Sequence, residues 1–296
     1  MSGPVNLLNA VTPFESLERR TLMSSAVLVN GVLRVAGDGS STNTIIVAES
    51  SDGASVNVLI TSTNAAGLDK SLNWSFPKAM GITEVRVRGG GKNDIISVGQ
   101  PSALFGIEAL DLPARVWGLG GNDLITTAGG NDVIFAGGGN DVVGAGGGND
   151  WVRGERGNDA LGGGDGDDLL NGGAGDDALD GQVGNDSARG DAGNDVVTGG
   201  VGDDVLFGGL GNDTIGGGDG NDALWGGAGD DILGGGLGDD TLGGVLGTNT
   251  LLGEDGADTF HVRDLAFNPT NDVDAAEGDV VTVVTIRREG PTPPAF

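Results

Sequence analysis

The sequence predicts an all-β fold, a right-handed parallel β-solenoid of nine-residue repeats preceded by irregular β rungs. The repeat unit returns sixteen times without insertion over residues 117–261. Glycine stands two residues before the aspartate of every unit and an apolar residue two after it, and only Asn249 replaces the aspartate. All nine prolines lie outside the repeat, so no strand within it lacks a backbone donor. A short unit repeated in register is typical of a solenoid.

Residues 1–26 form a segment of mixed composition. Its centre, FESLERRTLMS at residues 14–24, resembles the LEPR-like N-terminal segment that opens many exported surface proteins of some bacteria. The resemblance implies export to the cell surface, and the alternative is a frayed terminus or a short helix. The first thirty residues lack the basic start and long apolar core of a typical secretory signal, so we expect any export to use another signal.

Residues 27–116 show the apolar–polar alternation that is typical of strands. Six strands are predicted, at residues 32–35, 44–47, 56–60, 71–76, 83–88 and 95–98. Two stretches are similar to the repeat in weaker form: one has Asn43 in the aspartate position, and the other carries Asp94 out of frame, 29 residues before Asp123. We interpret the region as longer, irregular rungs that lead into the solenoid; a separate small β-sandwich is the alternative.

Residues 262–296 follow the repeat. Their β-prone stretch at residues 280–286 predicts a terminal strand or cap over the open end of the solenoid. The proline-rich residues 290–296 are predicted to be disordered.

Within the repeat, the first six residues of each unit are turn-formers, and the last three are expected to make a very short strand. The apolar eighth residue is expected to be the one side chain that points inward. Two units then make one turn of 18 residues, and residues 18 apart stack about 4.8 Å apart. This stacking predicts two columns of aspartates. One column contains Asp123, Asp141, Asp159, Asp177, Asp195, Asp213 and Asp231, and the other contains Asp132, Asp150, Asp168, Asp186, Asp204, Asp222, Asp240 and Asp258.

Stacked carboxylates at this spacing repel by roughly 1 kcal/mol per neighbour in water, so we expect positive charge between successive turns. Aspartate and glycine-carbonyl oxygens favour Ca²⁺, whereas zinc and copper favour cysteine or histidine. The chain has no cysteine and one histidine. Residues 117–261 hold 27 acidic and three basic residues, a net charge of −24. The columns contain 6 + 7 = 13 aspartate-to-aspartate steps, so roughly 13 Ca²⁺ ions would nearly balance this charge.

The unit matches Gly-Gly-x-Gly-x-Asp-x-apolar-x, and so resembles the repeat of the RTX (repeats-in-toxin, haemolysin-type) calcium-binding family. The resemblance implies a parallel β-roll, Ca²⁺ between turns, and export as an unfolded chain that folds in calcium-rich surroundings. It also implies that the aspartates of both columns are the metal ligands. Asn249 is expected to weaken the site that it shares with Asp231, and the loss of turn glycines at residues 154–156 and 181–183 is expected to loosen the sites there.

The formal charge of the whole chain is −28, which disfavours nucleic acid and anionic membrane surfaces as partners. No segment approaches the roughly 20 apolar residues of a membrane span. One face of the roll is expected to carry Phe135, Trp151, Phe207 and Trp225 together with arginines. We expect this face to dock the N-terminal β region, a second copy or a surface polymer; the alternative is a bulky side that matches the taper of the roll.

Catalysis has little support in the sequence. His261 is the only histidine and stands in a repeat position, and neither a nucleophile elbow nor a metalloprotease signature occurs. We therefore expect a secreted or cell-surface calcium-binding protein with a structural or adhesive role and no enzymatic activity. The alternative is a Ca²⁺-dependent polysaccharide-active enzyme of the β-helix type, with its catalytic groups in residues 27–116.

Overall fold

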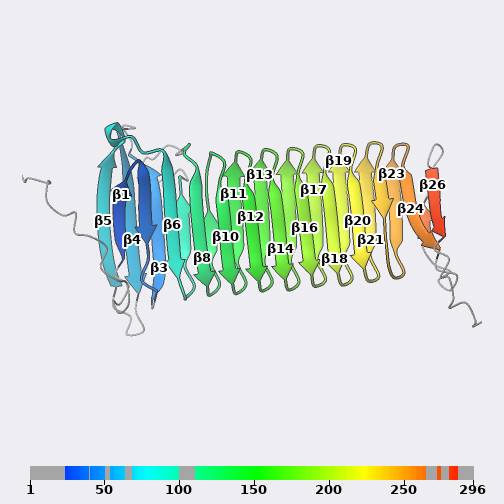
Figure 1. Ribbon diagram of the computed structural model, residues 1–296, viewed down its shortest axis with the longest axis horizontal. Coiled ribbons are helices and arrows are strands. Elements are labelled where there is room, and N and C mark those ends of the chain that lie inside the picture. Colours follow the sequence, from blue (N-terminus) through cyan, green and yellow to red (C-terminus); the bar gives the residue numbers. More distant parts are fainter. Residues whose placement is uncertain are drawn as a thin grey trace, which may run out of the picture.

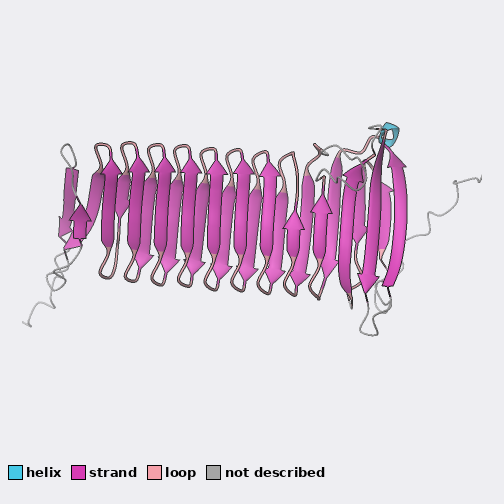
Figure 2. Ribbon diagram, turned by 180° about the vertical axis from the view of Figure 1, so that it is seen from behind, coloured by secondary structure: helices cyan, strands magenta, loops and turns pink. Residues whose placement is uncertain are grey.

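The computed structural model of the chain describes residues 24–39, 41–50, 54–63, 69–99, 111–264, 272–274 and 280–285. These residues form two 13-stranded sheets along the long axis of the molecule (Figure 1). The view from behind shows the strands side by side along this axis, with the 3-10 helix η1 (Lys78–Met80) at the N-terminal end (Figure 2). The all-β parallel solenoid predicted from the sequence is confirmed.

Successive strands of the roll alternate between the two sheets, here called sheets A and B. Sheet A contains, in spatial order, β1 (Ser25–Val29), β2 (Val32–Ala36), β6 (Glu84–Gly90), β8 (Ala114–Gly120), β10 (Val133–Gly138), β12 (Trp151–Arg156), β14 (Leu169–Ala174), β16 (Ser187–Ala192), β18 (Val205–Leu210), β20 (Ala223–Ala228), β22 (Thr241–Gly243), β24 (Thr259–Asp264) and β26 (Val280–Thr285). Sheet B contains β25 (Asp272–Asp274), β23 (Thr250–Asp255), β21 (Ile232–Leu237), β19 (Thr214–Asp219), β17 (Val196–Val201), β15 (Ala178–Val183), β13 (Ala160–Asp165), β11 (Val142–Gly147), β9 (Leu124–Thr126), β7 (Ile95–Val98), β3 (Thr42–Glu49), β4 (Ser55–Thr63) and β5 (Asp69–Pro77).

Each rung of the roll is 18 residues long, because parallel pairing places Leu206 opposite Leu224. Most roll strands have six residues rather than the three predicted, so that prediction is wrong. A strand runs from the seventh position of one unit to the third position of the next, and only the fourth to sixth positions form the turn. The first three positions of a unit are glycine-rich, yet they belong to the strand, because residues there pair with the next rung, as Gly209 in the second position does with Gly227. Tertiary pairing here overrides the local preference of glycine for turns.

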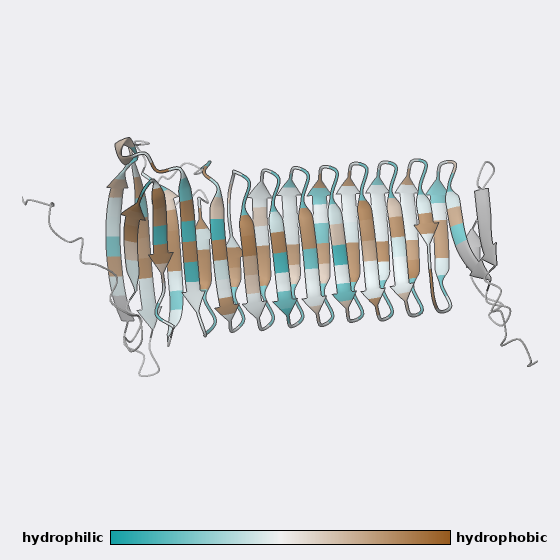
Figure 3. Ribbon diagram, viewed as in Figure 1, coloured by the Kyte–Doolittle hydropathy of each residue, from teal (hydrophilic) through white to brown (hydrophobic). Residues whose placement is uncertain are grey.

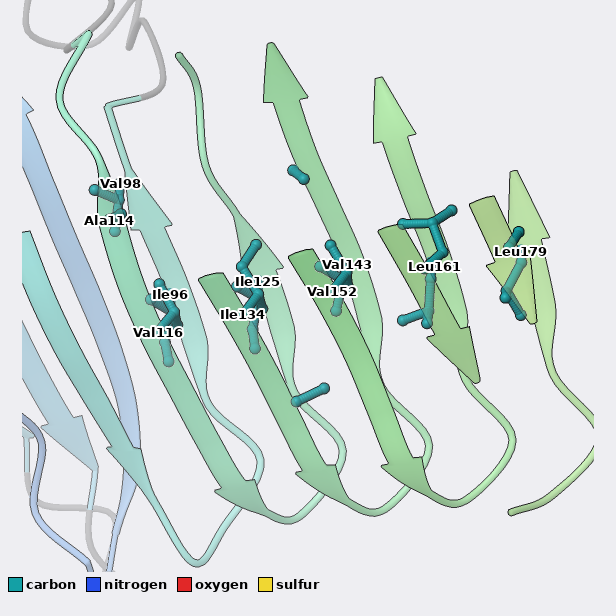
Figure 4. Packing of buried hydrophobic residues seen from close by; sticks show 14 of the residues in the cluster. Ile96, Val98, Ala114, Val116, Ile125, Ile134, Val143, Val152, Leu161 and Leu179 are labelled. Atoms are coloured by element: carbon teal, nitrogen blue, oxygen red, sulfur yellow. The ribbon is translucent and has the colours of Figure 1, made fainter. Parts of the chain in front are cut away.

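The core is a thin layer of side chains between the two sheets. Figure 4 shows Ile125, Val143 and Leu161 of sheet B beside Ile134 and Val152 of sheet A in this layer, and all are at most 3% exposed. Figure 3 shows apolar and polar bands that recur from strand to strand. The same positions are buried in successive rungs, as in β18 and β19, whose second and fourth residues are buried. The prediction that only the eighth residue points inward is wrong, because the sixth and first positions are buried as well.

The six strands predicted for residues 27–116 are all present. In sheet A, β6 pairs in parallel with β2 on one side and with β8 on the other. In sheet B, β7 pairs in parallel with β3 and with β9. Both sheets therefore continue from this region into the roll. Three pairings differ from regular rungs: β1 with β2, β3 with β4, and β4 with β5 are antiparallel. Alternation in the sequence cannot distinguish these directions, because both kinds of strand show it.

At the other end of the roll, β25 and β26 pair in parallel with β23 and β24. β26 agrees with the terminal strand predicted at residues 280–286. The LEPR-like stretch, residues 14–24, lies almost entirely outside the described residues, and the proline-rich residues 290–296 lie wholly outside them. Within the described ranges, no helix has the length and apolar character needed to span a membrane.

Candidate metal centre

The sixth-position aspartates lie at the turns, with their side chains directed into the roll. All fifteen of those predicted as ligands are at most 3% exposed. The backbone of each is held by its neighbours, as where the N–H of Thr214 donates to the carbonyl oxygen of Asp195 at 2.8 Å. The turn therefore fixes both the position and the direction of the carboxylate.

One carboxylate oxygen of each aspartate is used within the protein. Oδ1 accepts a hydrogen bond from the backbone N–H of the residue one rung earlier, as in the bond from Asp159 to Asp177 at 2.8 Å and from Asp186 to Asp204 at 2.7 Å. These bonds run along both columns, so the columns predicted from the 18-residue spacing are present. The ladder connects side chain to backbone, whereas the sequence predicted only stacked carboxylates.

The structure adds one aspartate to the first column. The N–H of Asp94 donates to Oδ1 of Asp123 at 2.7 Å, and Oδ1 of Asp94 accepts the N–H of Asn43 at 2.6 Å. The signal was present in the motif at residues 91–96, yet the count of 29 residues placed it out of frame. Sheet register sets the column, because Ile95 pairs with Leu124 and the additional residues lie in the connection between β7 and β8.

The second carboxylate oxygen is buried and has no hydrogen-bond partner in most of the ladder. This holds for Oδ2 of fifteen described aspartates, namely Asp94, Asp123, Asp132, Asp141, Asp150, Asp159, Asp168, Asp177, Asp186, Asp195, Asp204, Asp213, Asp222, Asp231 and Asp240. A buried polar atom without a partner costs free energy unless a ligand satisfies it. Repeated in register, such atoms indicate a ligand that is also repeated.

The space beside most Oδ2 atoms is held open by glycine in the first position of the unit, whereas Thr127, Ala136 and Ala145 occupy this position in the units of Asp132, Asp141 and Asp150. A Cβ at Gly154 would stand within 2.6 Å of the carbonyl oxygen of Gly172, and closer still to Oδ2 of Asp159. A Cβ at Gly208 would meet Oδ2 of Asp213 and the Gly226 carbonyl oxygen in the same way. A carboxylate oxygen and a carbonyl oxygen of the next rung thus share one cradle, an oxygen donor set that fits a hard cation.

Side chains alone do not complete such a site. Across the described ranges, no three or more His, Cys, Asp or Glu side chains converge as a metal cluster would. The sequence places one ladder aspartate in each unit, so the remaining ligands of a cation would have to be backbone carbonyl oxygens. This donor set excludes the sulfur and imidazole ligands typical of zinc.

Burial raises the pKa of the ladder aspartates. The pKa of Asp177 rises to about 7, because the ionised carboxylate loses water, and the hydrogen bond from the N–H of Asp159 offsets only part of this effect. Burial likewise raises the pKa of Asp132 to about 6, partly offset by hydrogen bonds from Thr127 and Ala114. The ionised ladder is therefore electrostatically unfavourable without added positive charge.

A second ladder follows the exposed fifth positions and runs in the opposite direction. Oδ1 of Asn122 accepts the N–H of Asn140 at 3.0 Å, and Oδ1 of Asp203 accepts the N–H of Asn221 at 2.8 Å. Asn and Asp serve equally as acceptors there, which explains why the two alternate at this position. The sequence indicated only that these residues suit turns.

Asn249 keeps its place in the ladder but changes the chemistry of the cradle. Its Oδ1 accepts the N–H of Asp231 at 2.9 Å, as a carboxylate would. Its Nδ2 lies against Gly244, where other rungs have Oδ2 against the first-position glycine. A donor thus stands where a cation needs an acceptor, which supports the prediction of a weak site at this rung.

The turns that lack glycine in the second position keep the same backbone. Glu155 and Gln182 have φ of 78° and 79°, in the left-handed region that glycine otherwise occupies at this position. The first-position glycines Gly154 and Gly181 are retained beside Asp159 and Asp186. That the sites in these turns are looser stays a prediction.

A two-sheet solenoid with 18-residue rungs and a ladder of buried oxygen donors at its turns defines a metal-binding β-roll. The family model of the RTX calcium-binding nonapeptide repeat (4 copies) matches residues 115–143, 144–179, 153–188, 180–215, 212–242 and 243–263, which together cover half of the chain. The chain belongs to this family, as the repeat predicted. No curated protein matches the chain.

Proposed function

We propose that the roll binds Ca²⁺ ions through its sixth-position aspartates and that binding drives folding. RTX repeats imply calcium binding, and the fifteen unpartnered Oδ2 atoms carry the assignment to individual residues. The proposed ligands are the fifteen aspartates predicted from the sequence, which include Asp258, together with Asp94, which joins the first column. Each Oδ2 shares its ion with the first-position carbonyl oxygen of the next rung, which belongs to glycine in most units and to Ala136 beside Asp123. With Asp94, the columns contain 14 aspartate-to-aspartate steps, one more than the 13 counted from the repeat alone.

Electrostatics supports the coupling of binding to folding. Folding removes the ladder carboxylates from water, and burial raises their pKa, for example to about 7 at Asp150 and Asp204. A bound Ca²⁺ supplies the positive charge that ionised carboxylates lack inside the roll. Because unfolded chain cannot place oxygens of successive rungs together, the ion stabilises only the folded form.

Far-UV circular dichroism of the full chain tests this proposal. In chelator at pH 8, we expect the spectrum of a largely unfolded chain, and millimolar Ca²⁺ should restore a β-rich spectrum. Mg²⁺ at the same concentration is the control and should have a much smaller effect, because it demands a rigid octahedral site and gives up water reluctantly. A β-rich spectrum that chelator leaves unchanged at pH 8 would contradict the proposal.

We further propose a secreted or cell-surface protein with a structural or adhesive role and no enzymatic activity. RTX repeat proteins are typically secreted, and extracellular fluid supplies the calcium that folding requires. The Phe135, Trp151, Phe207 and Trp225 face is the proposed docking surface, for a surface polymer or for self-association. The alternative is a Ca²⁺-dependent polysaccharide-active enzyme with its catalytic groups in residues 27–116. Within that region, Lys78 forms an ion pair with Glu49 at 2.5 Å. A polysaccharide-degradation assay with and without Ca²⁺ separates the two proposals, since turnover would favour the enzyme.

A further inference from the structure

The outer faces of the two sheets differ in the size of their ninth-position side chains. On sheet A, the ninth positions of successive rungs pair in register and carry large side chains. From β8 to β20 this row is Trp117, Phe135, Arg153, Asn171, Arg189, Phe207 and Trp225. Exposed Trp151 and Leu169 of the seventh positions flank the row. The row forms a ridge along the roll.

Aromatic rings of this ridge contact one another. Trp117 and Phe135 lie on neighbouring strands with ring centroids 6.2 Å apart and planes 11° from parallel, so the rings stack along the roll axis. Trp225 leans over Gly243, where a Cβ would collide with the indole, and stacks on His261 at 5.6 Å. Phe135 and Trp151 meet edge to face, with ring centroids 5.7 Å apart and planes 64° from parallel, so the rings do not form one flat platform for sugar rings. This geometry favours a grooved partner over a polymer.

Sheet B has a furrow at the same position of its rungs. From β9 to β21 the ninth-position residues are Thr126, Gly144, Gly162, Asp180, Thr198, Gly216 and Gly234, all small except the exposed Asp180. A Cβ at Gly144 or Gly216 would meet nothing within 4 Å, so the space above the sheet is open there, whereas the side chains of Gln182 and Glu254 reach the space over Gly162 and Gly234. Val142, Val196 and Ile232, each 50% exposed, border the furrow. Exposed apolar rows of this length mark contact surfaces.

The two faces also differ in charge. The outer face of sheet A from β6 to β20 carries six arginines, Arg86, Arg88, Arg115, Arg153, Arg156 and Arg189. Its three acidic residues are Glu84, Glu155 and Asp191; Glu84 pairs with Arg86 and Arg115, and Asp191 pairs with Arg189. The roll strands β7 to β23 of sheet B carry five outward acidic residues, Asp165, Asp180, Asp219, Glu254 and Asp255, and no basic residue.

We propose that copies of this chain stack face to back, with the sheet A ridge of one copy in the sheet B furrow of the next. Ridge and furrow share the same strand spacing of about 4.8 Å, so side chains match over many rungs, and arginines of one copy face aspartates of the other. The seven strands β8 to β20 present a footprint of roughly 34 by 20 Å, about 700 Å². This approaches the roughly 800 Å² per partner of a stable interface.

This contact joins two different surfaces on opposite sides of the molecule, so it does not close. Each added copy presents a new furrow or ridge, and the assembly is open-ended. The inference rests on the proposed function, because both faces exist only in the folded roll. Circular dichroism in Ca²⁺ reports folding separately from assembly, so failures of the two proposals are distinguishable.

Sedimentation velocity of the full chain in saturating Ca²⁺ tests the proposal with two charge-reversed variants. One variant carries Arg153→Glu and Arg189→Glu on sheet A, and the other carries Asp180→Arg and Asp219→Arg on sheet B. The wild type is expected to form species larger than a dimer, and each variant alone should sediment as a monomer. An equimolar mixture should assemble again, because the reversed faces complement one another. Lys92→Glu, a charge reversal in an exposed turn, is the matched control and should assemble as the wild type does.

Three outcomes would overturn the inference. A folded wild type that stays monomeric would exclude the contact. Loss of assembly in the sheet A variant alone, without rescue by mixing, would indicate a symmetric contact between two A faces. A monomer that binds polygalacturonate, with loss of binding in the sheet A variant, would assign the face to an acidic polymer.

Discussion

The backbone N–H of Asp195 donates a hydrogen bond to Oδ1 of Asp213 on the next rung, 2.9 Å away. The other oxygen of Asp213, Oδ2, is buried beside Gly208 without a hydrogen bond. The two oxygens of one carboxylate therefore differ in role: Oδ1 links the rungs, and Oδ2 carries charge that needs a cation. Substitutions at this residue can separate the two roles.

Asp213→Asn should keep the hydrogen bond to the Asp195 N–H and weaken calcium binding. Asp213→Ala should weaken calcium binding and also remove the hydrogen bond to the Asp195 N–H. That N–H, left buried without a partner, should lower the free energy of unfolding by about 1–3 kcal/mol more. Urea unfolding in saturating Ca²⁺ measures this difference, and a calcium titration followed by circular dichroism measures the midpoint. Asp203→Asn, at an exposed fifth position, is the control and should leave the midpoint unchanged. An equal shift of the calcium midpoint in Asp213→Asn and Asp203→Asn would indicate that the fifth positions also bind the ions.

Asn249→Asp should create a binding site where the wild type has an amide nitrogen against Gly244. The new carboxylate keeps the bond to the Asp231 N–H and adds an oxygen to the cradle, so we expect one further Ca²⁺ per chain. Equilibrium dialysis with metal analysis counts the ions. Asn212→Asp adds the same charge at an exposed fifth position, and its ion count should remain that of the wild type. An unchanged count in Asn249→Asp would show that this oxygen does not hold an ion.

The regular part of the ladder could be predicted because chain length and sheet register agree there. Asp123 and Asp141 are 18 residues apart, and the N–H of Asp123 donates to Oδ1 of Asp141 at 2.7 Å. Asp94 could not be assigned by counting, because the connection before β8 breaks the frame while sheet pairing preserves it. Its motif was visible, but only three-dimensional register places it in the column.

Strand length and strand direction required the structure. A residue such as Gly209 favours turns locally, yet in β18 it pairs with Gly227 of the next rung, because pairing is decided between distant segments. The antiparallel pairing of Val58 with Trp74 is likewise a long-range choice that local alternation does not encode. Sequence periodicity thus identified the site and its column, and tertiary pairing determined how much backbone surrounds it.

Acid should stabilise the calcium-free roll. Burial raises the pKa of Asp123 from 3.8 to about 7 and that of Asp195 to about 6. The folded chain therefore binds more protons than the unfolded chain between about pH 4 and 7, and the free energy of unfolding falls as pH rises through this window. In chelator, β content should therefore increase as the pH is lowered from 8 to 5.

Calcium binding should show the opposite dependence on pH, because protons compete for the same carboxylates. The calcium midpoint should therefore rise as pH falls from 8 to 5. Circular dichroism in chelator and calcium titrations at each pH measure the two trends. A calcium midpoint that is independent of pH would mean that the ladder carboxylates are not the ligands.

Gln182→Gly should stabilise the folded roll. Gln182 has φ of 79°, whereas the second position of most units holds glycine, as at Gly209 with φ of 126°. A side chain in this conformation costs about 1–3 kcal/mol, so its removal should raise the free energy of unfolding by about 1 kcal/mol in saturating Ca²⁺. Ser187→Gly, in the first residue of β16 where φ is not positive, is the matched control and should lower stability by about 0.5–1 kcal/mol. Urea unfolding distinguishes the two, and a loss of similar size in both variants would show that the turn stores no strain at Gln182.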